Sequence, residues 1–252
     1  MVVKLTIGYL GTRFAGWQRQ ANALAVQEVI EQALGDLLET PIRIRGASRT
    51  DAGVHASGQV AHLRLDRRFP LAGLVHGGNH RLPDDVRLLS AQRMADDFHA
   101  QHNALGKCYR YRLWRGPVVP PLAAGRVAHA PQRLDLDAMR QALRALPGRH
   151  DFTAFAAAGG SHRQGVRRMF AATLDVDAQV ACLRFWGDGF LRGMVRALVG
   201  TLLEIGRGAR PPDDFHRLFS ARSRSEAGPA APALGLELEQ VFYPPAYQPA
   251  VW

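Results

Sequence analysis

Residues 46–63 read GASRTDAGVHASGQVAHL, a glycine-rich loop followed by the start of a strand. The segments around this loop, IRIR (42–45) and QVAHLRL (59–65), have the β-branched and alternating apolar residues that are typical of strands. The sequence therefore predicts two neighbouring strands joined by a loop. That loop carries one carboxylate, Asp51, beside Arg49.

The elements on either side of this pair complete a recognisable order. Residues 2–9 alternate like a strand, and residues 25–39 place apolar side chains at helical spacing. A helix is expected after Pro70, ending near Arg81, and a strand over residues 86–94. The order is β-α-β-β-α-β, which is the ferredoxin-like plan.

The rest of the chain repeats this order in its elements, although not in its letters. The expected elements are a strand at 107–114, a helix at 135–146 capped by Asp135, a hairpin of 169–177 and 180–187, a helix at 190–206, a short helix from Asp213 and a strand at 236–243, with a loop at 222–234. We expect two domains, 1–103 and 104–252. The predicted fold class is α+β, with two ferredoxin-like or RRM-like halves that form one extended, mainly antiparallel sheet with a central basic active-site cleft.

Composition restricts the classes of function. The chain has 252 residues and a formal net charge of +10, carried almost entirely by arginine. Arginine binds phosphates and stacks on bases, which indicates a nucleic-acid partner; a GC-rich genome is the other source of arginine, but it does not explain a pI near 10.7. Cys108 and Cys182 are far apart and suggest neither a disulfide framework nor a zinc cluster. With no apolar run of membrane-spanning length and no signal peptide, we expect a cytoplasmic protein.

Asp51 allows two interpretations from its residue type and surroundings. The nearby glycines let the backbone approach a ligand closely, and Arg49 favours the charged carboxylate. An ionised carboxylate in such a loop can act as a nucleophile or as a general base. Asp beside Gly more commonly forms a turn by bonding its own backbone. Composition alone does not separate the two.

Two further segments carry residues with both a functional and a structural interpretation. The expected helix 190–206 is apolar over most of its circumference, with Arg192, Arg196 and Glu204 on a narrow polar stripe. This stripe faces water, or Arg196 is half-buried and needs an anion. Tyr109 and Tyr111 share one face of the strand 107–114; they are half-buried core residues, or they stack on bases as in single-strand binders.

Several motifs together resemble the tRNA pseudouridine synthase A (TruA) family. They lie in the family's order over nearly the whole chain, and several matches in register are far more specific than one. The motifs are GYLGTRFAGWQRQ (8–20), SRTDAGVHASGQV (48–60), DDFHA (96–100), KCYRY (107–111), HDFTAF (150–155), GFLRGMVRALVGTLLEIG (189–206) and ALGLELEQVFY (233–243).

The resemblance implies an isomerase that converts uridine to pseudouridine in the anticodon stem-loop of tRNA. Asp51 matches the catalytic aspartate and Arg196 its basic partner. Tyr109 matches the tyrosine that stacks on uracil, and Arg49 would fill the space of the flipped base. The resemblance implies a homodimer, with no metal and no cofactor.

The chain departs from the family pattern at three positions. Leu10 stands where the family often has Asp, Ser48 where it usually has Gly, and Gln101 where Arg is common. These differences concern RNA affinity and site preference more than the chemistry, because Asp51 and its expected partners match.

Two other functions compete with the isomerase. A non-catalytic RNA-binding protein of RRM-like architecture explains the charge and the element order but gives no reason for Asp51, since a carboxylate repels phosphate. A hydrolase using Asp51 and His55 explains the loop but not the basic composition.

Overall fold

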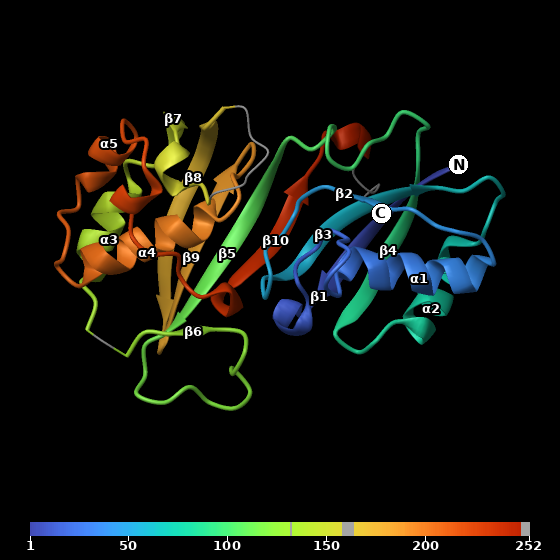
Figure 1. Cartoon of the computed structure of the whole chain (residues 1–252), viewed down its shortest axis with the longest axis horizontal. Helices are drawn as coiled ribbons and strands as arrows, with labels where there is room; N and C mark the ends of the chain where they lie inside the picture. The colour runs from blue at the N-terminus through green and yellow to red at the C-terminus, as the bar shows by residue number, and fades with distance from the viewer. Residues whose placement is uncertain (132, 158–163, 248–252) are drawn as a thin grey trace. The chain divides into compact units, whose positions relative to one another are not determined.

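The computed structural model of the chain describes residues 1–131, 133–157 and 164–247 (Figure 1). Its contacts divide the chain into two compact units: unit 1 consists of Met1–Gly106 with Leu238–Trp252, and unit 2 of Lys107–Glu237. The chain passes from unit 1 into unit 2 and back. The sequence-based division after residue 103 gave all later residues to the second half, and that division into domains stays a prediction.

Unit 1 contains the predicted β-α-β-β-α-β order. Its elements are β1 (Val2–Tyr9), α1 (Val26–Leu38), β2 (Arg45–Gly46), β3 (His55–Arg64), α2 (Leu71–Arg81) and β4 (Val86–Met94). β1 pairs with β3 and with β4, both antiparallel. The apolar stripe of α1 explains its burial, with Ile30 and Leu34 fully buried. α2 packs against both α1 and β4.

The predicted strand 42–45 is wrong in position, because only Arg45 and Gly46 form β2. Side chains of α1 bind the backbone that precedes it. The Ile44 N–H donates to the Glu31 carboxylate at 3.0 Å, and the Gln27 amide donates to the Ile44 carbonyl at 3.1 Å. Glu31 is buried, so these bonds replace a strand partner for Ile44.

Unit 2 follows the expected order and adds short elements. Its elements are β5 (Gly106–Trp114), β6 (Ala128–His129), α3 (Leu136–Leu143), β7 (Gly148–Asp151), β8 (Val166–Asp177), β9 (Val180–Gly187), α4 (Met194–Gly206) and α5 (Asp214–Leu218). The Asp135 carboxylate caps α3 by accepting the N–H groups of Asp137 and Ala138, as the sequence predicts. β6 and β7 were not predicted, since two and four residues give no period to detect.

The predicted helix 190–206 begins later than expected, at Met194. Gly193 precedes it with φ of 71°, a left-handed conformation that interrupts helical geometry. The Arg192 carbonyl instead accepts the Ala157 N–H at 2.8 Å. Arg192 therefore lies outside the helix and does not share a helical stripe with Arg196, contrary to the sequence analysis.

The strands of the described residues form one sheet in the order β4-β1-β3-β10-β5-β9-β8-β7, where β10 is Leu236–Phe242. β2 pairs with β3, and β6 pairs with β5. The β5–β9, β7–β8 and β8–β9 pairs are antiparallel, whereas β5–β6 is parallel. The α+β class and the extended, mainly antiparallel sheet are confirmed. Among the described residues, no helix has both the length and the apolar composition to cross a membrane.

Candidate active site

The loop that carries Asp51 joins β2 to β3 in unit 1. Asp51 itself is half-buried, while Arg49 is exposed and Thr50 is buried between them. The Val54 N–H donates to the Asp51 carbonyl at 3.1 Å and closes a turn directly after the carboxylate. The loop expected from the sequence is thus confirmed, and it presents one acidic and one basic side chain at its surface.

The first anchor of this loop is Gln59 on β3. Its side chain is fully buried, and its amide bonds both backbone groups of Ser48. The Ser48 N–H donates to Gln59 Oε1 at 3.3 Å, and Gln59 Nε2 donates to the Ser48 carbonyl at 2.7 Å. The Ala47 N–H also donates to the Val60 carbonyl at 2.7 Å. The entry to the loop is therefore fixed through the backbone of Ser48, which does not depend on the side chain at that position.

The second anchor is the segment 8–17, which packs against the same loop. Tyr9 Oη lies 2.8 Å from Thr50 Oγ1, and the Trp17 N–H donates to the Thr50 carbonyl at 3.1 Å. The Gly53 N–H donates to the Phe14 carbonyl at 3.2 Å. Thr50, directly before Asp51, and Gly53, two residues after it, are thus both bonded to one segment of unit 1. The two anchors hold the backbone on both sides of the carboxylate.

Gly16 allows this close approach. Its φ is 101°, and a Cβ placed on it would lie 2.5 Å from the Thr50 carbonyl oxygen. A side chain at this position would therefore collide with backbone, which cannot move as the end of a flexible side chain can. Gly16, within the GYLGTRFAGWQRQ motif, is thus needed beneath the Asp51 loop because it has no side chain.

His55 begins β3 and is buried. Its Nδ1 accepts the Gly11 N–H at 3.0 Å, so this nitrogen serves to hold the segment 8–17. A hydrolase that uses His55 as a base through Nδ1 would have to give up that bond. The structure therefore favours a structural role for this nitrogen.

Tyr109 lies on β5 in unit 2 and is 5% exposed. Its ring meets Phe190 edge to face, with centroids 5.0 Å apart and an interplanar angle of 77°. Tyr111, two residues later on the same face, is fully buried and donates its hydroxyl to the Pro232 carbonyl at 2.8 Å. Burial raises the pKa of Tyr111, and the nearby charge of Arg196 opposes that rise. Tyr111 is therefore a core residue.

Arg196 lies on α4 and is half-buried, as one of the two interpretations of the sequence required. Its Nε donates to the Ala231 carbonyl at 2.7 Å, and the Ala231 N–H donates to the Arg196 carbonyl at 2.9 Å. This reciprocal pair fixes the guanidinium relative to the segment that follows α5. The orientation of Arg196 thus depends on where that segment is held.

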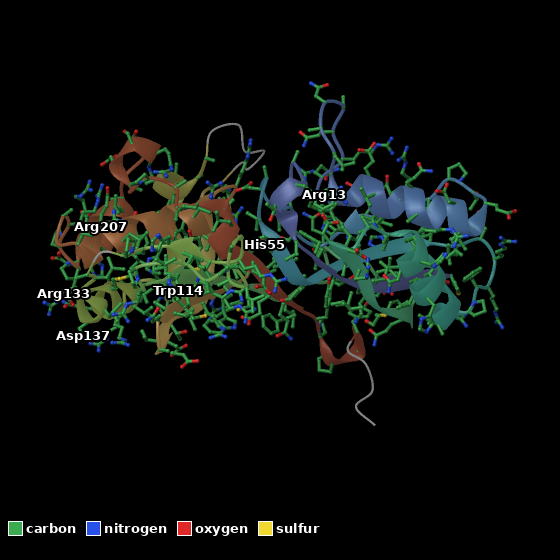
Figure 2. The ribbon with its side chains drawn as sticks, turned by 90° about the horizontal axis from the view of Figure 1, so that it is seen from below. Arg13, His55, Trp114, Arg133, Asp137 and Arg207 are labelled. Atoms are coloured by element: carbon green, nitrogen blue, oxygen red, sulfur yellow. The ribbon has the colours of Figure 1, made fainter. Side chains whose placement is uncertain are left out.

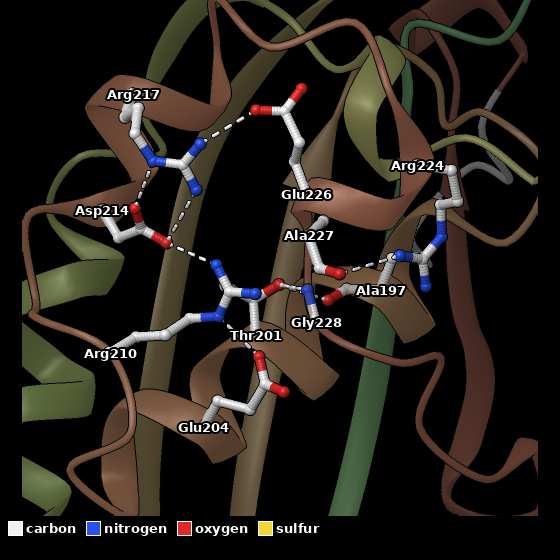
Figure 3. Close-up of polar contacts among 10 residues, drawn as sticks. All are labelled: Ala197, Thr201, Glu204, Arg210, Asp214, Arg217, Arg224, Glu226, Ala227 and Gly228. Atoms are coloured by element: carbon white, nitrogen blue, oxygen red, sulfur yellow. Dashed lines mark hydrogen bonds and ion pairs between the residues drawn. The ribbon is translucent and has the colours of Figure 1, made fainter.

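A network of side chains holds the segment on α4 (Figure 3). The Gly228 N–H donates to Thr201 Oγ1 at 2.9 Å, and this hydroxyl donates to the Ala197 carbonyl at 2.9 Å. Burial opposes ionisation of Asp214, but hydrogen bonds from Arg217 and Arg210 outweigh it and lower the pKa of that carboxyl. The remaining bonds join Arg210 to Glu204, Arg217 to Glu226 and Arg224 to the Ala227 carbonyl. Residues 224–231 are therefore fastened to α4 and α5.

Lys107 is a further candidate residue of the active site, and the sequence analysis assigned it no role. It shares the β5 face of Tyr109, and burial lowers the pKa of its ammonium group, as does the charge of Arg167, against the opposing charge of Asp188. One signal was available: Lys107 is one of two lysines in a chain whose other cations are arginines. A half-buried lysine beside Tyr109 is chemically distinct from the surface arginines.

The arginines supply the basic surface of both units. Arg133 and Arg207 of unit 2 are exposed, whereas the exposed Arg13 of unit 1 is paired with Asp85, and Figure 2 shows nitrogen-tipped side chains projecting from the ribbon around these labelled positions. Within the described residues, no group of three or more His, Cys, Asp or Glu side chains is arranged to hold a metal ion. The surface chemistry is suited to a polyanion.

Comparison with known proteins gives consistent matches over most of the chain. A family model described as tRNA pseudouridine synthase matches residues 6–103 and 142–244. A protein of Syntrophotalea carbinolica named tRNA pseudouridine synthase A is 47% identical over 245 residues, which is 97% of each chain. Proteins with the same name from Pelobacter propionicus and Geobacter sulfurreducens are each 43% identical over 96% of this chain and 99% of theirs.

Replacing Gly16 with Ala tests the support beneath the Asp51 loop. Gly16→Ala combines left-handed backbone strain with a collision, so we expect a loss of about 3 kcal/mol in the free energy of unfolding. Gly208→Ala is the matched control, because Gly208 has φ of 75° but no atom within 4 Å of the added Cβ. It should lose only about 1 kcal/mol. Urea denaturation measures both, and equal losses would contradict the collision.

Proposed function

Because the chain belongs to the tRNA pseudouridine synthase family, we propose that it isomerises uridine to pseudouridine in the anticodon stem-loop of tRNA, with Asp51 as the catalytic carboxylate. The observation that carries the assignment of Asp51 is the loop itself. Gln59 and the segment 8–17 bond the backbone on both sides of this residue. A turn carboxylate with no further task does not need two independent anchors.

The reaction needs a carboxylate near the sugar. The C1′–N1 glycosidic bond breaks, the uracil turns, and a C5–C1′ bond forms. C5 then loses a proton while N1 gains one, so substrate and product are isomers. An ionised aspartate can capture or stabilise the cationic C1′ centre, as carboxylates do in retaining glycosidases. It can also act as the base that opens a glycal route. One carboxylate suffices, because the base is rejoined and not lost to water.

The other site residues are assigned by role. Arg196 is the basic partner of the catalytic carboxylate; its half-buried guanidinium, fixed by the Ala231 carbonyl, supports this assignment. Tyr109 stacks on the uracil, which its ordered ring beside Phe190 supports. Arg49 occupies the space left by the flipped uridine, which its exposure on the Asp51 loop supports. Flipping costs a few kcal/mol, and least in loops.

The location of the protein follows from its substrate. We place it in the cytoplasm, where tRNA is modified. Cell fractionation that recovered the protein outside the cytoplasm would contradict this assignment.

Tritium release from a tRNA transcript labelled at uridine C5 tests the chemistry. The wild type should release tritium, and Asp51→Asn should reduce the rate by about 10²–10⁴-fold or more, because the amide is neither base nor nucleophile. Binding of the transcript should stay within about twofold, since the substitution does not remove a cation.

Asp36→Asn is the control, because Asp36 is an exposed carboxylate on α1. It should release tritium at the wild-type rate. Wild-type release by Asp51→Asn would defeat the assignment of Asp51. Binding without release by the wild type, over a panel of tRNAs, would favour the non-catalytic RNA-binding protein.

Variants of unit 2 test the supporting roles. Tyr109→Phe keeps the stacking ring, whereas Tyr109→Leu loses it, so the Leu variant should lose a further ~5–150-fold in kcat/KM, equivalent to about 1–3 kcal/mol of stacking. Arg196→Gln should lower kcat at saturating RNA, and Arg207→Gln, which removes an exposed cation, should not. Equal effects of the Phe and Leu variants would exclude stacking by Tyr109.

The proposed assembly is a homodimer. Its support is the resemblance to the tRNA pseudouridine synthase A family, which implies a homodimer. Light scattering coupled to gel filtration should give twice the 27.7 kDa of one chain. A mass of 27.7 kDa that does not change with concentration would contradict the dimer.

A further inference from the structure

Three histidines of unit 1 form a continuous column, His62, His99 and His102. His62 lies on β3, and the other two follow β4. The His62 and His99 ring centroids are 4.6 Å apart, and those of His99 and His102 are 4.1 Å apart. The column runs from the buried His62 through the half-buried His99 to the exposed His102. It therefore leads from the sheet to the surface.

Backbone N–H groups fix the two inner rings. The Ala100 N–H donates to His62 Nδ1 at 3.1 Å. The N–H groups of Gln101 and His102 both donate to His99 Nδ1, each at 3.2 Å. A ring nitrogen that accepts a hydrogen bond carries no proton, so both inner rings are held neutral by their geometry. His102 is the ring at the exposed end.

Cations surround this column. Arg45 is opposite His62 in the β2–β3 register, and Arg64 lies two residues after His62 on β3; both are exposed. Burial first, and then His99, Arg64 and Arg45, lower the pKa of His62 to about 4. Burial, His102, Arg45 and Arg64 lower the pKa of His99 in the same direction. The positive charge around the column therefore disfavours the protonated forms of His62 and His99 and favours the binding of an anion.

The other charged groups near the column have partners of their own. Lys4, opposite His62 on β1, donates to the Tyr247 carbonyl at 2.7 Å and lies over the Tyr243 ring. Arg64 donates to the backbone carbonyl of Asp96 at 2.9 Å. The Asp97 carboxylate accepts the Tyr247 hydroxyl at 3.5 Å, and the Asp96 side chain is exposed. None of these contacts places a carboxylate against the imidazole rings.

We propose that Arg45, Arg64, His99 and His102 form a binding site for a backbone phosphate of RNA. The site rests on the proposed function for its ligand. The arginines supply permanent charge, and the exposed His102 ring can donate a hydrogen bond to the phosphate. His62 is a positioning residue that anchors the column.

The test measures the dissociation constant of a tRNA transcript over a range of salt. Arg45→Ala with Arg64→Ala should weaken binding about tenfold and reduce the slope of log K against log salt by about 1 to 2. His102→Ala should weaken binding less than the arginine pair does, because it leaves both permanent charges in place.

Two controls of the same residue types lie on α2 of the same unit. His76→Ala and Arg81→Ala remove exposed side chains of that helix and should keep the wild-type affinity and salt dependence. Thermal melting verifies the fold of each variant. If the column variants bind like these controls, the site is wrong, whatever the activity of the enzyme.

The catalytic assay keeps this result separate from the proposed function. The column variants should raise the KM for the transcript as their binding weakens, so their loss of kcat/KM should lie in KM and not in kcat. Inactivity of the wild type would defeat the proposed function, while RNA binding by the column would still be measurable. A tenfold fall in release at saturating RNA would overturn the assignment of the column to phosphate binding alone.

Discussion

The buried amide of Gln59 is the interaction on which the proposed site of unit 1 depends. It bonds the N–H and the carbonyl of Ser48 from a position with no exposure. An amide buried in this way loses its bonds to water, so it favours the one loop conformation that satisfies both of its groups. Thr50 is then fixed from the opposite side by Tyr9 and Trp17. Asp51 is thus prepositioned by backbone bonds, and the binding of a substrate need not order it.

A different constraint operates on β5 of unit 2, where aromatic and basic side chains alternate along one strand. Tyr109 and Tyr111 occupy one face, and Arg110 and Arg112 the other. Glu237 is buried and accepts hydrogen bonds from both arginines at 2.8–3.0 Å. Buried charges are tolerated only when they are paired, and this carboxylate pairs two of them. The single carboxylate therefore balances one of the two positive charges on the arginine face within the unit.

Local patterns predicted most elements and failed where distant side chains intervened. The strand expected at 42–45 is displaced because Glu31, on another element, binds its backbone. The helix expected from residue 190 starts late because Gly193 takes a left-handed conformation that hydrophobic spacing does not reveal. Asp51 became a candidate because a carboxylate is unusual in a basic, glycine-rich loop, and its catalytic role stays a prediction. Its support by Gln59 could not be predicted, since a glutamine in a strand gives no local sign of the backbone it will bond.

The return of the chain to unit 1 has a consequence for synthesis on the ribosome. Residues 1–106 are made first, but their unit also includes Leu238–Trp252, and β10 lies next to β3 in the sheet. Nearly all of unit 2 is synthesised before β10 emerges from the ribosome. During that time the edge of β3 that pairs with β10 remains unpaired. Unpaired strand edges favour aggregation. Gly58 shows how closely β10 packs. A Cβ at this position would lie 2.2 Å from the Glu239 carbonyl oxygen, so β10 must fit closely against β3. The order of translation thus makes the last strand the closing step of the first unit.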